Sequence, residues 1–502
     1  MPSDFDREFA YAADPVPWIL ESFEGGGGSA GMKVRVEGSS KEKTLWCSAD
    51  YLGLGADAEV REQARAAMEK FTVGSCGPRG FYGTTTAHLD LEHSLAAFMQ
   101  EEEAISYSDS TSTIASVIPA FAKRGDVLLI DSEANFGIQQ GARLSRSKVV
   151  WWEHNNTKDL ERHLLAVKAM DEQRRAASGG ILGGGGGASP SEQRRFIVVE
   201  GLYASSGSLA PLPEVCRLAR EYRWRVVLDD SAGFGVLGGA GRGTPEHYGM
   251  KAGEGPCVTV GSLATALGGV GGFCVGSREV VDHQRLSGVG YCFSASAPPY
   301  LCASASAALA ALRQRPHLTE DLRKSSAALH AELCAEDIAE GFEVVSHPLS
   351  PTKHLRVSQR GLRRGFSGGG GAGAPAAAAA ESSSSSVVEQ AVARAAEGLR
   401  LTTPPSTPSR AAVAARMLSP TTQKLPPPDA RQAKALDREE ALIDRVVALA
   451  ADKGVLITRL HVIPGEPVRA RPSLKFHLTL RHTQEDKRAL LTALREIVAQ
   501  LF

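Results

Sequence analysis

Three absences limit what this chain of 502 residues can be. It has no apolar run of the roughly 18 residues that a membrane-spanning helix needs. Residues 1–23 begin with acids and contain no long apolar core and no small-residue cleavage site, so we expect no secretory signal. Neither sign of charge dominates, because 56 lysines and arginines face 57 aspartates and glutamates. This balance excludes a strong overall field for nucleic acid or an anionic membrane, and the sequence by itself predicts a soluble chain.

Paired cysteines are also missing. The eight cysteines form no C-x-x-C pair, and several stand inside apolar runs. Such a distribution favours reduced, buried thiols in a cytosol-facing protein over a disulfide scaffold.

Low-complexity segments divide the chain. GGGGS occupies residues 25–29, and a glycine-rich run covers about 179–191. The longest run, about 364–431, is dominated by Gly, Ala, Ser and Pro, which cannot bury enough apolar surface to offset its ordering entropy. We therefore interpret 179–191 and 364–431 as insertions, the second one disordered.

The length exceeds what one compact core usually holds, so two domains are expected. We predict an N-terminal arm over 1–50, a large domain over 51–315 and a small C-terminal domain over 316–502. The insertion at 364–431 falls inside the small domain. A surface loop tolerates such an insertion because its closure entropy grows only logarithmically with length.

Short β-branched runs alternate with helical patterns in the large domain. We expect strands at 127–131, 148–152, 196–200, 225–229, 257–261 and 271–276, and helices at 59–70, 88–100 and 213–223. This order predicts an α/β domain with a mostly parallel sheet that is covered on both faces.

The C-terminal part has a different pattern. Its helices are expected at 438–454 and 485–502, and its strands at 455–462, at 473–482 and within 342–350 and 354–358. This order predicts a smaller α+β unit.

Two short motifs allow more than one interpretation. GFGVLG at 233–238 has the G-x-G-x-x-G form of a dinucleotide site, but turn-rich sequence follows it instead of a helix, which favours a turn. Asp229 ends a strand, where it can hold a ligand such as a protonated pyridine nitrogen or can simply bond its own backbone in a turn. No Ser-His-Asp or metal-ligand spacing stands out.

Five longer blocks are more specific. They read VGSCGPRGFYGTTTAHLDLE (73–92), KRGDVLLID (123–131), RRFIVVEGLY (194–203), GFGVLGGAGRGTPEHYG (233–249) and DHQRLSGVGYCFSASAPP (282–299). Together they resemble the α-oxoamine synthase family of pyridoxal-phosphate enzymes, and within it the lysine-lacking subunits of serine palmitoyltransferase. The resemblance extends from about residue 45 to the C-terminus, apart from the insertions. It implies a fold type I transferase fold similar to that of aspartate aminotransferase.

The loop GSLATALGG (261–269) departs from the catalytic members of that family. Their loop resembles G-T-F-S-K-A-L-G, whose lysine forms the imine with the cofactor, and Thr265 stands at that position here. A hydroxyl cannot form an imine or serve as the amine base that removes the substrate's α-proton. The resemblance therefore implies a chain that is not catalytic on its own.

Other positions depart in the same direction. By the resemblance, Asp229 is the retained partner of the pyridine nitrogen, whereas Ala232 and Asn135 stand where the family has histidines. The arginine that binds the substrate carboxylate is absent, with only Ser473 or Lys475 near its position.

Two segments are expected to complete the site of a partner subunit, because family members form dimers whose sites lie between subunits. In the glycine-rich segment 74–84, glycines permit close backbone approach, and Arg79 and Tyr82 are expected to point outward. The other segment is CFSAS (292–296), where Ala295 replaces the usual threonine. The expected contributors are Cys76, Gly77, Arg79, Tyr82, Ser294 and Ser296. The alternative is that both segments are turns that serve the fold alone.

The resemblance implies a subunit of an enzyme that condenses L-serine with a long-chain acyl-CoA, releasing CoA and carbon dioxide. A lysine-bearing partner in a heterodimer would bind pyridoxal phosphate covalently. It also implies association with the cytosolic face of the endoplasmic reticulum, although this sequence has no membrane helix. Two alternatives remain: an autonomous pyridoxal-phosphate enzyme using Lys251 or Lys123, and a scaffold or regulatory protein that contributes nothing to a site.

Overall fold

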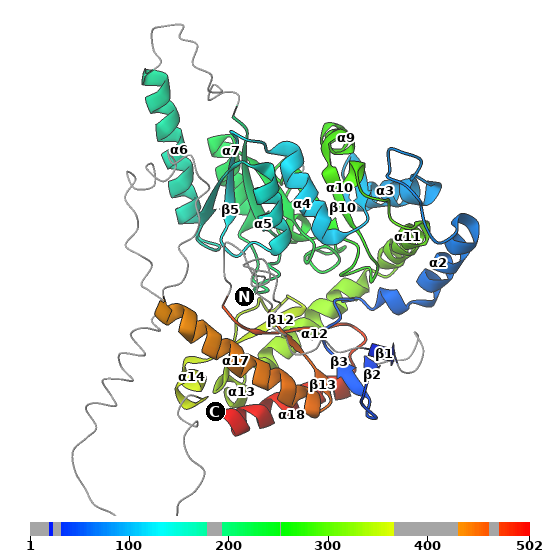
Figure 1. Cartoon of the computed structure of the whole chain (residues 1–502), viewed down its shortest axis with the longest axis vertical. Coiled ribbons are helices and arrows are strands. Elements are labelled where there is room, and N and C mark those ends of the chain that lie inside the picture. Colours follow the sequence, from blue (N-terminus) through cyan, green and yellow to red (C-terminus); the bar gives the residue numbers. More distant parts are fainter. Residues whose placement is uncertain (1–19, 24–31, 178–192, 252, 366–429, 461–470) are drawn as a thin grey trace, which may run out of the picture.

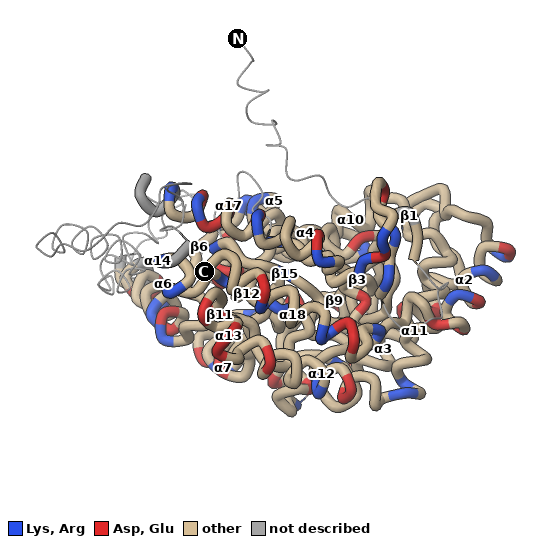
Figure 2. The backbone as a smooth tube through the Cα atoms, turned by 90° about the horizontal axis from the view of Figure 1, so that it is seen from below, with Lys and Arg blue, Asp and Glu red and all other residues tan. Residues whose placement is uncertain are grey.

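The computed structural model describes residues 20–23, 32–177, 193–251, 253–365, 430–460 and 471–502 (Figure 1). The segment 25–29, the insertion 179–191 and all but the two ends of the insertion 364–431 lie outside these ranges, so the prediction of disorder stays untested. Within the described residues, no helix combines the length and the apolar character needed to cross a membrane. Basic and acidic residues are interspersed along the backbone (Figure 2).

A seven-stranded sheet forms the centre of the large unit. Its strands, in spatial order, are β4 (Glu103–Tyr107), β10 (Gly272–Gly276), β9 (Val258–Ser262), β8 (Arg225–Asp229), β7 (Arg195–Glu200), β5 (Val127–Asp131) and β6 (Lys148–Trp152). Only β10 pairs antiparallel with its neighbours, and the pairs from β9 to β6 are parallel. The predicted parallel sheet and all six of its predicted strands are confirmed, to within one residue at each end.

Helices cover both faces of this sheet because successive side chains of a strand point to opposite sides. In β5, Leu128 and Ile130 pack in one core cluster with residues of two helices, α4 (Ser110–Phe121) and α5 (Phe136–Ser145). Leu129 packs in another cluster with residues of α6 (Thr157–Ala177) and α7 (Leu212–Tyr222). The helices of the large unit are α2 (Ala58–Phe71), α3 (Thr86–Met99), α4 (Ser110–Phe121), α5 (Phe136–Ser145), α6 (Thr157–Ala177), α7 (Leu212–Tyr222), α8 (Thr244–His247), α9 (Arg278–Ser287), α10 (Val289–Cys292) and α11 (Pro299–Gln314), with the short 3-10 helix η2 (Leu54–Ala56).

The smaller unit lies below the large sheet in Figure 1 and is built on an antiparallel sheet. Its strands are β11 (Phe342–Val344), β12 (Thr352–Val357), β15 (Leu474–His477) and β14 (Thr458–Arg459). Its helices are α12 (His317–Leu333), α13 (Glu336–Ala339), α14 (Gln359–Gly365), α17 (Ala430–Asp452) and α18 (Gln484–Leu501). The expected α+β character is confirmed, while the domain boundaries at about 50 and 315 remain a prediction.

A third sheet joins the beginning of the described chain to its last part. Its strands are β1 (Leu20–Phe23), β2 (Lys33–Val36), β3 (Lys43–Leu45) and β13 (Val455–Leu456). The prediction of one strand over 455–462 was wrong, because Val455 and Leu456 pair with β3 whereas Thr458 and Arg459 pair with β15. The segment changes sheets at Ile457, and residues 461–462 lie outside the described ranges.

The parallel strands position the candidate site. Because β5, β7 and β8 run in one direction, their last residues Asp131, Glu200 and Asp229 meet at one edge of the sheet. The small sheet faces this edge, where His354 Nε2 of β12 lies 3.2 Å from the Ala204 carbonyl oxygen.

Candidate functional site

Asp229 is buried at the end of β8 and is held by two hydrogen bonds. Its Oδ2 accepts from Asn135 Nδ2 at 2.8 Å, and its Oδ1 accepts from the backbone N–H of Ser231 at 3.1 Å. The second contact is the turn contact that the sequence allowed as the simpler interpretation. Burial raises the pKa of Asp229, against the effect of these hydrogen bonds.

Asn135 connects Asp229 to a second buried acid. Asn135 Oδ1 caps α5 by accepting from the backbone N–H of Ile138 at 3.1 Å. The backbone N–H of Asn135 donates to Glu200 Oε1 at 2.7 Å. Glu200 is the register partner of Asp229 on β7. Burial and, next, the neighbouring Asp229 raise the pKa of Glu200 to about 8. We did not single out Glu200 from the sequence, although an acid that ends a strand beside Asp229 was a usable signal.

Thr265 completes this group, which we call the edge cluster (Asn135, Glu200, Asp229 and Thr265). Its hydroxyl donates to the carbonyl oxygen of Ser231 at 2.8 Å, and its carbonyl accepts from the N–H of Tyr51 at 3.0 Å. The Thr265 side chain, which the resemblance aligns with the catalytic lysine, is therefore engaged with backbone and offers no amine.

The N-terminus of α4, another natural anion site at this edge, is occupied by the chain itself. The Asp109 carboxylate caps the helix by accepting from the N–H of Ser112 at 2.7 Å. Ser110 Oγ lies 2.8 Å from Ser262 Oγ and donates to the carbonyl oxygen of Gly271 at 2.6 Å. A carboxylate at this N-terminus disfavours a second anion, such as a cofactor phosphate.

The small sheet contributes Ser473 and Lys475, the two residues expected near the missing arginine. Ser473 Oγ bonds His354 Nδ1 at 2.9 Å. Burial lowers the pKa of Lys475, and the charge of Glu200 acts in the opposite direction. Neither residue presents the two-pronged donor that arginine offers to a carboxylate.

These groups do not fit covalently bound pyridoxal phosphate in this chain. Thr265 has no amine, Asp229 Oδ2 is occupied by Asn135, and Asp109 takes the helix terminus. The alternative lysines are badly placed: Lys123 and Lys251 are exposed and precede β5 and β9, toward the amino edge of the sheet, opposite Asp229.

The glycine-rich segment 74–84 and the segment 292–296 form one structural unit. Ser296 donates to the Gly77 carbonyl oxygen from its N–H at 3.0 Å and from its hydroxyl at 2.9 Å, and Ser75 Oγ donates to the Ser296 carbonyl oxygen at 2.8 Å. A Cβ at Gly83 would lie 1.9 Å from the Gly77 carbonyl oxygen. Glycine at 83 is thus required by packing, and Ser296 holds the two segments together.

The expected outward orientation of Arg79 was wrong. Arg79 is buried and forms a two-pronged ion pair with Glu92, with Nη1 2.7 Å from Oε1 and Nη2 3.0 Å from Oε2. Arg79 also donates to Ser106 Oγ at 2.9 Å. Arg79 therefore anchors the segment 74–84 to the interior of the large unit. A buried guanidinium needs such an acid partner, and Glu92 on α3 supplies it.

Other expected contributors do lie at the surface. Cys76 is exposed, and Tyr82 is fully exposed, both with positive φ of 57° and 68°. Ser294 is partly exposed, with its Oγ 3.4 Å from Ser108 Oγ. Whether these residues, with Gly77 and Ser296, contribute to a partner's site stays a prediction.

Large apolar side chains gather on and beside these two segments. We call this set the apolar loop surface, and its members are Val73, Phe81, Tyr82, Leu286, Val289 and Phe293. It includes the four most exposed large hydrophobic side chains among the described residues, from 73% to full exposure. Large exposed apolar side chains that lie close together are typical of surfaces that bind another molecule.

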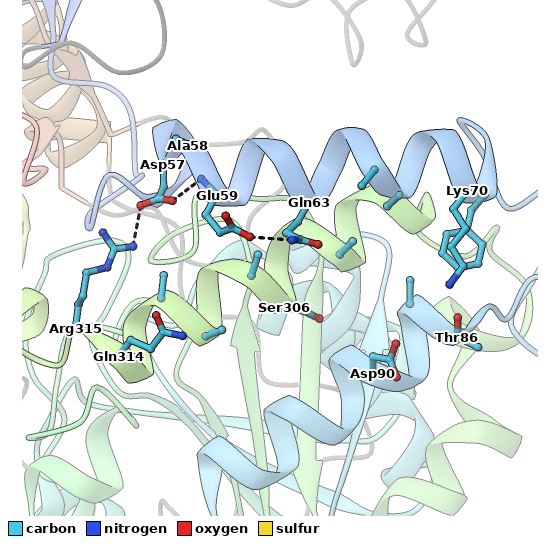
Figure 3. A pocket seen from close by; sticks show the side chains of 18 residues that line it. Asp57, Ala58, Glu59, Gln63, Lys70, Thr86, Asp90, Ser306, Gln314 and Arg315 are labelled. Atoms are coloured by element: carbon cyan, nitrogen blue, oxygen red, sulfur yellow. Dashed lines mark hydrogen bonds and ion pairs between the residues drawn. The ribbon is translucent and has the colours of Figure 1, made fainter.

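A separate groove of about 1040 Å³ runs between α2 and α11, with α3 at one end (Figure 3). Figure 3 shows Arg315 and Asp57 closing one end, with a 2.7 Å contact from Arg315 Nη2 to Asp57 Oδ2, and Lys70 near the other. Its floor is formed mainly by alanines, and none of the edge cluster lines it.

Comparison with known proteins places these features in a family. The aminotransferase class I and II model matches residues 41–359. The chain is 43% identical over 329 residues to long chain base biosynthesis protein 1b of Oryza sativa subsp. japonica, covering 66% of this chain and 64% of that protein. It is 41% identical over 307 residues to serine palmitoyltransferase 1 of Dictyostelium discoideum, covering 61% and 60%. The chain thus spans less than two thirds of the length of these relatives.

Solved structures agree on the fold. The serine palmitoyltransferase of Sphingomonas wittichii has a TM-score of 0.69 at 19% identity, covering 97% of this chain and 93% of that one. The 8-amino-7-oxononanoate synthase of Francisella tularensis has a TM-score of 0.59 at 16% identity, covering 91% and 98%. The predicted fold type I transferase fold is confirmed, and the chain belongs to the aminotransferase class I and II family of pyridoxal-phosphate proteins.

Proposed function

We propose that this chain is the non-catalytic subunit of a serine palmitoyltransferase. The observation that carries the proposal is the contrast between Thr265, whose hydroxyl is bonded to backbone, and the apolar loop surface, which is built and left exposed. The similarity to long chain base biosynthesis proteins supports the assignment to this enzyme.

In this proposal a lysine-bearing homologue forms a heterodimer with the chain. The complex condenses L-serine with a long-chain acyl-CoA such as palmitoyl-CoA to give 3-oxosphinganine, CoA and carbon dioxide, the first step of sphingolipid synthesis. Pyridoxal phosphate, bound covalently by the partner, supplies the electron sink for decarboxylation and carbon–carbon bond formation. This chain walls the partner's site with the segments 74–84 and 292–296.

The individual roles follow from position. Cys76 and Tyr82 extend from the segment 74–84 and are the side chains available to the partner, with Ser294 beside them. Gly77, Arg79 and Ser296 act indirectly: they fix the segments through the contacts Ser296–Gly77 and Arg79–Glu92. Association with the endoplasmic reticulum would come through the partner, which membrane fractionation with and without that partner tests.

The test is co-expression with a lysine-bearing homologue, followed by co-purification and a condensation assay with serine and palmitoyl-CoA. We expect activity in the complex and none in the isolated chain, which should also show no borohydride-reducible imine. A double variant, Tyr82→Ala with Phe293→Ala, should weaken the complex. Leu144→Ala, on the exposed face of α5, is the matched control because its side chain is also well exposed.

A site contribution and a pure scaffold give different results for Cys76→Trp. If Cys76 borders the partner's site, the bulky side chain lowers activity or changes amino-acid preference while the complex still assembles. Unchanged activity and serine preference in an assembled complex would favour the scaffold. Imine formation by the isolated chain would instead support the autonomous enzyme and refute the proposal.

A further inference from the structure

A serine, a histidine and an aspartate form a hydrogen-bonded chain at the carboxyl edge of the large sheet. Asp131 Oδ1 lies 2.8 Å from His154 Nδ1, and His154 Nε2 lies 2.8 Å from Ser208 Oγ. Nucleophile, base and orienting acid are thus each within hydrogen-bond distance of the next, which is the geometry of an activated serine. None of these three residues is a member of the edge cluster.

The fold brings the three residues together from distant positions. Asp131 ends β5, His154 follows β6 by two residues, and Ser208 lies in the loop after β7. In the sheet these strands are neighbours in the order β7-β5-β6, all parallel, so their following loops meet. The spacing of 131, 154 and 208 in the sequence contains no local motif.

The surroundings fix the roles of the acid and the base. Asp131 is fully buried and accepts the backbone N–H groups of Glu133 at 2.9 Å and Asn155 at 3.0 Å. With Nδ1–H donating to Asp131, His154 Nε2 accepts, from the Ser208 hydroxyl at 2.8 Å and from Asn155 Nδ2 at 3.2 Å, while Ser206 Oγ lies 2.9 Å from Ser208 Oγ. The ring of Tyr203 packs edge-on against His154, with 4.5 Å between the ring centroids.

The charges that face His154 come from three elements. Burial lowers its pKa, but Asp131 and, less strongly, Glu133 raise it, and Arg356 of β12 lowers it; the net shift is upward. Glu133 Oε2 lies 3.5 Å from His154 Nε2, and Arg356 Nη2 lies 3.6 Å from Glu133 Oε1. His154 is therefore a base of increased strength with a cation nearby.

Buried polar atoms without hydrogen bonds collect around the same histidine. Within the described part of the chain, Glu133 Oε2, Asn155 Oδ1 and Arg356 Nε are buried and have no hydrogen-bond partner, and Glu133 Oε2 has only its 3.5 Å ion-pair contact with His154. Each such atom calls for a water, an ion or a ligand, because leaving it unpaired costs free energy. Three of them beside one base indicate a place for a polar ligand, and Arg356 Nε can donate to negative charge on it.

We propose that Ser208, His154 and Asp131 form an acyl-transfer triad that hydrolyses activated esters or thioesters. Ser208 Oγ bonds to the acyl carbon while its proton passes to His154 Nε2, and the carbon–sulfur or carbon–oxygen bond breaks. The leaving thiolate or alkoxide takes that proton. His154 then removes a proton from water, and the hydroxide attacks the acyl-serine. The carboxylic acid is released, and His154 returns the proton to Ser208 Oγ.

This activity needs no pyridoxal phosphate and no partner subunit, so it can be tested independently of the proposed function. A chain that assembles into an active condensing complex can lack the hydrolase, and the reverse is equally possible.

The test uses the purified full-length chain, alone and in complex, with a fluorophosphonate probe and with p-nitrophenyl acetate and acetyl-CoA as substrates. We expect probe labelling on the peptide that contains Ser208, located by mass spectrometry. Ser208→Ala and His154→Gln should each lower the hydrolysis rate by about 100-fold or more. The rate should rise with pH as His154 loses its proton, with a midpoint above that of an ordinary histidine.

Ser205→Ala is the matched control, since Ser205 Oγ donates to the Glu133 carbonyl oxygen and does not contact the triad. It should keep both labelling and rate. Circular dichroism identifies a variant that fails to fold, in which case the labelled position in the unmodified chain decides. Absence of labelling at Ser208, or equal rates in folded Ser208→Ala, would show that the three residues only join the loops after β5, β6 and β7.

Discussion

The edge cluster and the apolar loop surface place their side chains in opposite environments. In the edge cluster, Asn135 donates a hydrogen bond to Asp229, and Thr265 donates one to a backbone carbonyl oxygen. Polar groups that could bind a ligand therefore bind one another. At the apolar loop surface, side chains as large as Tyr82 and Phe293 are held in solvent. The comparison teaches that buried polar groups can satisfy one another through internal hydrogen bonds, while large apolar side chains of the same fold stay in solvent.

Arg79→Leu should give the largest effect, because it leaves Glu92 buried without its ion-pair partner. We expect the free energy of unfolding to fall by about 3–5 kcal/mol. Chemical denaturation of the isolated chain measures this. Arg217→Leu is the control, since Arg217 pairs with Glu214 and Glu221 on the surface of α7 and should change little. Equal effects at both positions would contradict the view that the apolar loop surface is supported from within.

Glu200→Gln should change the pH dependence of stability in the edge cluster. Burial raises the pKa of Glu200 from its ordinary 4.5 to about 8, so between these values the folded state holds a proton that the unfolded state has lost. The free energy of unfolding therefore falls as pH rises through this window, by up to about 5 kcal/mol. Urea titrations at several pH values should show a flatter profile for the variant; an unchanged slope would place the cause elsewhere.

Gly83→Ala should disturb the apolar loop surface without touching the edge cluster. Its Cβ would lie 1.9 Å from the Gly77 carbonyl oxygen, so the segment must shift, at a cost of roughly 1–3 kcal/mol. Gly80→Ala is a control in the same segment, since a Cβ there meets nothing within 4 Å. Co-purification of the partner should weaken for the first variant only. A loss for both would mean that any change in the segment is harmful.

Thr265→Ala should have the smallest effect. It removes one hydrogen bond to the Ser231 carbonyl oxygen, which is worth about 1 kcal/mol or less. Activity of the complex should be unchanged, because no reacting group is lost. A tenfold loss of activity in an assembled complex would give the edge cluster a catalytic task and remove the contrast.

Local sequence patterns predicted most of the large sheet. Strands such as β5 and β8 are short apolar runs rich in Val, Ile and Leu, and their residues could be read directly from VLLID and RVVLD. The change of sheet at Ile457 could not be predicted in this way, because no glycine or proline marks the break within 455–462 and only distant partners distinguish the two halves.

Side-chain direction in the candidate site was the least predictable property. Thr265 and Asn135 were found through the resemblance, because it aligns positions. The inward turn of Arg79 depends on Glu92, thirteen residues away on another element, and no pattern in the glycine-rich segment marks that pairing. The contact of His154 with Ser208 depends on strand order in the sheet, which the sequence does not state.

The pairing of β3 with β13 has a consequence for biosynthesis. Lys43 Nζ donates to the Ala451 carbonyl oxygen across 408 positions, and Thr44 pairs with Val455. During translation, β3 therefore cannot pair with β13 until almost the whole polypeptide has been synthesised. Apolar residues such as Met32 and Val34, buried in the finished protein, stay open to chaperones throughout that delay.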